Sequence, residues 1–99
     1  MATSKKQFQT YNGFAIPLQP ETDLGLAMLI AEGEDGQHEP VAVVGTISEA
    51  REAAASDLRD RMRRLESGED AGICPTLYKV WARGIDGTYC TAFEITDIV

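Results

Sequence analysis

The chain has 99 residues, 43% of them hydrophobic and 25% charged, which is the composition of one small globular domain and not of a disordered segment. Its formal net charge of −7 argues against binding to nucleic acid or to an anionic membrane, because both require basic residues that face phosphate groups. No apolar run is long enough to span a bilayer and no hydrophobic signal segment follows the basic start, so we expect a cytoplasmic protein without a membrane partner.

The N-terminal part of the chain predicts a loose tail followed by a strand. We assign residues 1–7 to the tail and residues 8–99 to a single domain. The Asn-Gly pair at residues 12–13 lies between two aromatic residues and predicts a tight hairpin turn. Apolar residues alternate over residues 14–18, and Pro17 in that stretch either places the strand at an edge of the sheet or ends it early.

Two more strands are expected before a helix. Residues 24–32 carry small or apolar side chains on both faces, which indicates a strand that is central in the sheet or covered on both faces. A polar loop follows, and then a short apolar strand over residues 41–44 leads directly into the helix.

The most informative segment is residues 45–68, which predicts one well-capped amphipathic helix. Thr46 and Glu49 have capping-box spacing: the hydroxyl can accept from the Glu49 amide, and the carboxylate can reach back to the Thr46 amide. Gly68 suits the left-handed position just after the helix. Apolar residues at steps of three or four form one stripe that should lie on the sheet: Ile47, Ala50, Ala54, Leu58, Met62 and Leu65.

After the helix, residues 77–83 and 88–95 predict a hairpin around Asp86-Gly87, a pair that favours a two-residue turn. The turn sets the register and divides the side chains between two faces. The face expected under the helix contains the pairs Tyr78–Ile95, Val80–Phe93 and Ala82–Thr91. The opposite face contains the pairs Lys79–Glu94, Trp81–Ala92 and Arg83–Cys90, with Ile85 opposite Thr88 at the turn.

These elements predict an α+β fold: an antiparallel sheet of four or five strands packed on one helix, in the chain order of three strands, the helix and two strands. On the outer face of the hairpin, Trp81 has no core to join, and an exposed tryptophan often anchors a binding surface. Lys79, Arg83 and Glu94 would form its rim. The favoured function is therefore a non-catalytic interaction or regulatory module that binds a protein partner or a second copy of itself. The competing interpretation is that the N-terminal segment covers Trp81, or that its ring lies across Ala92.

Two other functions stay open. A small-ligand binder or minor enzyme would have a pocket between helix and sheet, with Tyr78, Tyr89, Met62 and Cys90 as candidate lining residues. An RNA-binding protein would use the arginines of the helix, although the acidic residues between them favour a solvated face. The arginines concerned are Arg59, Arg61, Arg63 and Arg64.

Catalysis, metals and cofactors have little support in the sequence. His38 is the only histidine, and Cys74 and Cys90 lack the paired spacing of a structural zinc site. In the expected reducing compartment both cysteines would be thiols. No nucleophile motif or phosphate-binding loop is visible. We therefore expect no catalytic residues, no bound metal and no cofactor.

The junction at residues 43–50, Val-Val-Gly-Thr-Ile-Ser-Glu-Ala, resembles the strand-to-helix junction of HicB-type antitoxins. The resemblance extends over residues 24–65. It implies an acidic antitoxin that binds a basic toxin, which is one form of the interaction hypothesis. The chain departs from that family in the hairpin that follows the helix and in lacking a recognisable DNA-binding extension, and no residue role is carried over.

Overall fold

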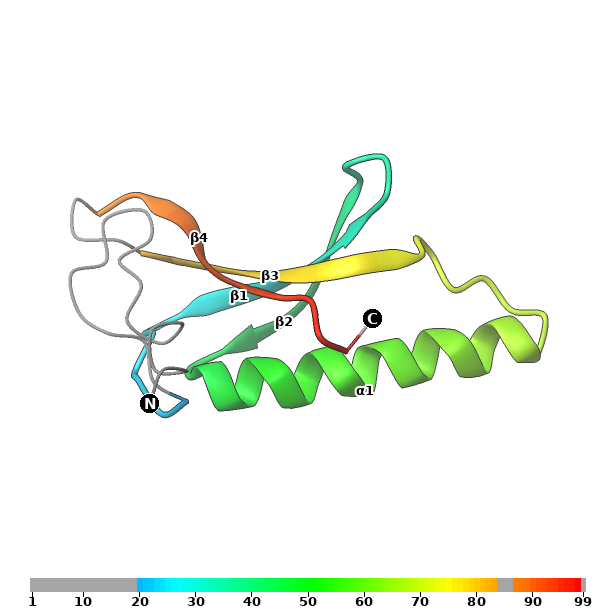
Figure 1. Ribbon diagram of the computed structural model, residues 1–99, viewed down its shortest axis with the longest axis horizontal. Helices are drawn as coiled ribbons and strands as arrows, with labels where there is room; N and C mark the ends of the chain where they lie inside the picture. Colours follow the sequence, from blue (N-terminus) through cyan, green and yellow to red (C-terminus); the bar gives the residue numbers. More distant parts are fainter. Residues whose placement is uncertain (1–19, 84–86, 99) are drawn as a thin grey trace.

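One long helix lies against one face of a four-stranded antiparallel sheet (Figure 1). The structure is a computed structural model, and it describes residues 20–83 and 87–98. The elements are β1 (Ala27–Gly33), β2 (His38–Val44), α1 (Ile47–Glu66), β3 (Pro75–Arg83) and β4 (Tyr89–Ile95). The strands lie in the order β2-β1-β3-β4, so the predicted α+β class and the predicted central position of β1 are both confirmed.

The strands before the helix differ in detail from the prediction. Two described strands precede α1, where three were expected; the tail, the turn at residues 12–13 and the strand at residues 14–18 lie outside the described residues. β2 begins at His38 and not at residue 41, although it contains Pro40. Proline is tolerated there because β2 is an edge strand, where an absent amide hydrogen leaves no neighbour unpaired.

The helix begins as predicted, with one change in its cap. Thr46 is the N-cap, and its hydroxyl accepts a hydrogen bond from the Glu49 amide at 3.1 Å. The Glu49 carboxylate accepts from the Gly45 amide at 2.7 Å, one residue before the predicted Thr46 amide. At the other end Gly68 has φ +79°, the left-handed conformation predicted for it.

The core lies between α1 and the inner face of the sheet. The helix contributes Ile47, Ala50 and Ala54, whose small side chains let it approach the strands closely. The sheet contributes fully or almost fully buried residues from each strand, chiefly Ala27, Leu29, Ala31, Val44, Tyr78, Val80, Ala82, Ala92 and Ile95. The prediction that the Tyr78–Val80 face of the hairpin packs under the helix is confirmed.

The second half of the predicted helix stripe does not join this core. Met62 and Leu65 are both more than half exposed, so their assignment to the core was wrong. A helix of 20 residues is about 30 Å long, whereas a strand of 7 residues spans about 23 Å. The helix is thus longer than β1, β2 and β4, and in Figure 1 its C-terminal part extends past the strands. Among the described residues, no helix combines the length and the apolar character needed to cross a membrane.

Candidate functional site

The register of the C-terminal hairpin agrees with the prediction for half of its length. Tyr78–Ile95, Lys79–Glu94 and Val80–Phe93 are paired as expected. Beyond Val80 the register shifts by one residue, because Ala92 has no partner on β3 and forms a β-bulge. The predicted partners of residues 81–83 were therefore wrong. The last pair is Arg83–Tyr89, and the predicted turn lies partly outside the described residues.

The bulge changes which side chains of β4 share a face with Trp81. Trp81 is now opposite Thr91, and Arg83 is opposite Tyr89. Cross-strand partners point to the same side of a sheet, so the bulge brings Tyr89 to the outer face beside Trp81. Cys90 moves to the inner face, opposite the fully buried Ala82. A bulge of this kind re-aims side chains without breaking the strand.

The outer face of the sheet, on the side away from α1, is apolar and hollowed. The hollow has a volume of about 680 Å³ and is lined by residues of all four strands and of the segment before β1. Its lining is Leu26, Ala27, Met28, Ile30, His38, Pro40, Val43, Trp81 and Tyr89. Leu26 is 75% exposed, Val43 62% and Trp81 37%. We call this surface the open face; contiguous apolar patches of this kind mark interaction sites more often than isolated apolar residues do.

At one end of the open face, Lys79 and His38 both contact the carboxylate of Glu32. Lys79 Nζ lies 2.7 Å from Glu32 Oε1, and His38 Nε2 lies 3.3 Å from the same oxygen. The hydrogen bond from Lys79 lowers the pKa of Glu32, and the nearby His38 acts in the same direction against the opposing effect of burial. Lys79 therefore forms an ion pair with Glu32, although its cross-strand partner on β4 is Glu94. The His38 ring also lies 6.0 Å from the Trp81 ring.

The other end is held by hydrogen bonds to the backbone. The Tyr89 hydroxyl donates to the Leu26 carbonyl at 3.2 Å, across the sheet. Arg83 Nε donates to the Gly87 carbonyl at 3.0 Å, and its guanidinium carbon lies 6.0 Å from the centre of the Tyr89 ring. These contacts fix Tyr89 as a wall of the hollow and leave part of its ring exposed.

The residues proposed for a pocket between helix and sheet do not come together. Tyr78 is fully buried under α1, where its hydroxyl donates to Asp57 at 2.8 Å. Burial and that carboxylate raise the pKa of Tyr78 above its ordinary value. Tyr89 lies on the opposite face of the sheet, and Met62 is exposed on the outer part of α1. Cys90 is half-buried, and its thiol contacts the Ala82 carbonyl. No single cavity of the described residues contains all four.

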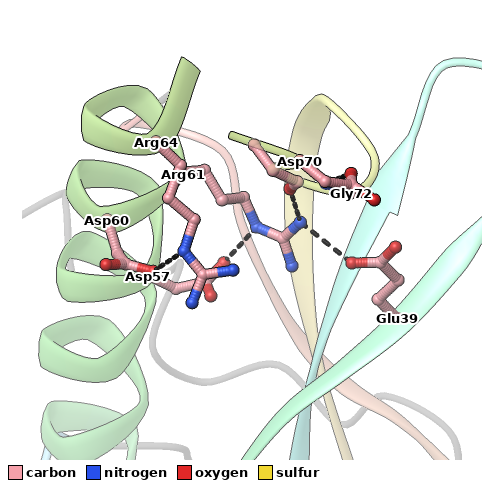
Figure 2. A pocket seen from close by; sticks show the side chains of 8 residues that line it. Glu39, Asp57, Asp60, Arg61, Arg64, Asp70 and Gly72 are labelled. Carbon is pink, nitrogen blue, oxygen red and sulfur yellow. Dashed lines mark hydrogen bonds and ion pairs between the residues drawn. The ribbon is translucent and has the colours of Figure 1, made fainter. Parts of the chain in front are cut away.

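A polar pocket of about 290 Å³ does lie between α1 and the edge of the sheet, and sequence reasoning missed it (Figure 2). Its centre is Arg61, a buried arginine whose guanidinium lies 2.7 Å from Asp57 and 2.9 Å from Glu39. Arg61 also donates to the carbonyls of Ala71 and Ile73, at 2.8 and 3.2 Å. Arg64 at the same pocket pairs with Asp60. The charges are paired with one another, so the pocket ties the connection before β3 to the helix and offers a ligand few unused groups.

The arginines considered for RNA binding are mostly occupied as well. Arg61 is buried, while Arg63 and Arg64 both form ion pairs with Asp60. Arg59 is exposed on the outer face of α1. Neither cysteine forms a disulfide within the part of the chain that the structure describes. Within residues 20–83 and 87–98, no group of three or more histidine, cysteine or acidic side chains is arranged to hold a metal ion.

No protein-family model, no curated protein and no solved structure matches this chain. The resemblance to HicB-type antitoxins is therefore not supported by a family match, and it is limited to a similar strand-to-helix junction.

Proposed function

We propose that this protein is a non-catalytic interaction module and that the open face is its binding surface. The observation that carries the proposal is the apolar hollow on the side of the sheet away from the helix, with Trp81 partly exposed in it. A sheet that is covered on one side only normally presents polar residues on the other side. Here the second side presents a leucine, a valine and two aromatic rings instead.

The residue types and their arrangement favour a protein partner. Tryptophan and tyrosine are enriched among the residues that dominate binding energy, and here they lie side by side on neighbouring strands. The centre of the surface is apolar and its charged groups are at the ends, which is the usual arrangement of a protein interface. Covering apolar surface contributes about 25 cal/mol per Å², so exposed side chains such as Leu26 and Val43 favour association.

A small-ligand site or an enzyme has less support. The open face has few polar groups to orient a substrate. The polar groups of the pocket in Figure 2 bind one another. An acidic antitoxin that binds a basic toxin would be one concrete form of the interaction proposal.

The proposal is tested by capture of partners with matched variants. Tagged protein is incubated with nuclease-treated lysate of its own source, in parallel with Trp81→Ala and Leu65→Ala. Leu65 is the control because it is an exposed apolar residue on the helix, away from the open face. We expect a stoichiometric protein that Leu65→Ala retains and Trp81→Ala loses. Equal capture by both variants would contradict a binding surface at Trp81.

A further inference from the structure

We infer that the occupant of the open face is a second copy of this chain, related to the first by a two-fold axis. The inference rests on the proposed function and names the partner. Its basis is the position of two charged residues on either side of Trp81, which become complementary when two open faces meet.

Along β3 the outward side chains are Lys79, Trp81 and Arg83, while Glu94 points outward from β4 opposite Lys79. Lys79 is neutralised by Glu32 at 2.7 Å. Among the described residues, Arg83 and Glu94 have no ion-pair partner. They are separated by four residue steps, about 13 Å along the strands, which is too far for an ion pair within one copy.

Consider a two-fold axis that lies midway between the two facing sheets, perpendicular to the strands and at the level of Trp81. Rotation about this axis reverses the direction of the strands in the second copy. It places β3 of one copy over β3 of the other, so that each Arg83 reaches the level of Lys79 and Glu94 in the second copy. Because Glu32 neutralises that Lys79, Glu94 supplies the unpaired charge at this level. Facing sheets are about 10 Å apart, a gap that an arginine and a glutamate can bridge together. Two symmetric ion pairs would then flank a central contact between the Trp81 rings, in an interface that is the same patch on both copies.

The net charge of −7 on each copy opposes association, but it is located mainly elsewhere. The helix has five acidic and five basic residues, so it carries no net charge. On the outward faces of the strands, Lys79 and Arg83 balance Glu32 and Glu94. At physiological ionic strength, charges are screened over about 8 Å, so this repulsion is weak across the interface. The local complementarity of Arg83 and Glu94 therefore decides the orientation.

The test is sedimentation of the full chain over a dilution series, with charge-reversed variants. Arg83→Glu and Glu94→Arg each place like charges together at both symmetric positions, and each should raise the dimer dissociation constant about tenfold. The double variant Arg83→Glu/Glu94→Arg restores both pairs and should recover the dimer. Arg59→Glu makes the same charge change on exposed α1 and should leave the dissociation constant unchanged. If the double variant has the same raised dimer dissociation constant as the single variants, the proposed two-fold arrangement is wrong.

Acrylamide quenching of Trp81, the only tryptophan of the chain, separates this inference from the proposed function. We expect quenching that is strong in the dilute monomer and that falls as the dimer forms. A chain that is monomeric at every concentration, with an accessible Trp81, overturns the second copy and leaves the binding surface in place. A dimer with an equally accessible Trp81 also overturns it. Shielding of Trp81 in the monomer would overturn both proposals, because the chain itself would then cover the face.

Discussion

Replacement of Arg61 by methionine should destabilise the protein more than any other exchange of a charged residue on α1. The side chain is 10% exposed and reaches four partners on three segments: Asp57 on the helix, Glu39 on β2, and the carbonyls of Ala71 and Ile73. Methionine fills a similar volume but donates no hydrogen bond. The connection before β3 would then lose its main attachment to the helix.

The size of the effect follows from what remains after the exchange. Removal of one partner from a buried ion pair costs about 3–5 kcal/mol, since the other charge stays buried and unpaired. Here the Glu39 side chain is 36% exposed and can be hydrated instead, which reduces the cost. Asp57 keeps the Tyr78 hydroxyl as a donor. We therefore expect Arg61→Met to lower the free energy of unfolding by about 2–4 kcal/mol.

Urea denaturation at neutral pH measures this loss as a lower midpoint with an unchanged slope. The matched control is Arg64→Met, which removes an exposed arginine with Asp60 as its ion-pair partner and should cost less than about 1 kcal/mol. Equal losses in the two variants would refute the argument that burial makes Arg61 the main support of this region.

Three further changes have defined outcomes. Thr46→Ala removes the helix N-cap and should cost about 1 kcal/mol, again by urea denaturation. Glu32→Gln should remove a pH-dependent part of the stability: because Lys79 lowers the pKa of Glu32 in the folded protein, this contribution is complete above the ordinary glutamate pKa of about 4.3 and is lost as the pH falls through the lower folded value. Thermal unfolding of both proteins between neutral and acid pH should therefore converge in acid. Gly72→Ala should lower the melting temperature, because Gly72 has φ +72° and a Cβ atom would lie 2.7 Å from a Glu39 carboxylate oxygen.

The helix and the face of the hairpin that packs under it could be predicted because both follow from local patterns. Thr46 and Gly68 mark the helix ends by their own chemistry, and the alternation of Tyr78 and Val80 places them on one face whatever surrounds them. The register near the start of β3 was predictable for the same reason.

The bulge and the buried arginine were not predictable in this way. Ala92 is small and suits either a paired or an unpaired position, so the sequence around it gives no signal for a bulge. The bulge then decides that Tyr89, and not Cys90, joins Trp81 on the open face. Arg61 faces inward in the part of α1 that extends past the strands. There the backbone carbonyls of residues 71 and 73 require hydrogen-bond donors, which an apolar side chain could not supply.

The apolar character of the open face is another feature of tertiary structure. Leu26 and Val43 are far apart in the chain, and they line one hollow because β1 and β2 pair so that Met28 lies opposite Val43. The sequence identified Trp81 as outward-facing from the hairpin alone. The neighbours that turn it into a surface come from the other two strands.

The most direct test of the open face is NMR of the dilute protein with a soluble paramagnetic probe. Each exposed methyl-bearing residue has a buried counterpart of the same type: Leu26 is 75% exposed and Leu29 is 0% exposed, while Val43 is 62% exposed and Val80 is 0% exposed. We predict strong broadening of the Leu26 and Val43 methyl signals and little change for Leu29 and Val80. Equal protection of all four residues would contradict the account, because the outer face of the sheet would then be covered within the single chain.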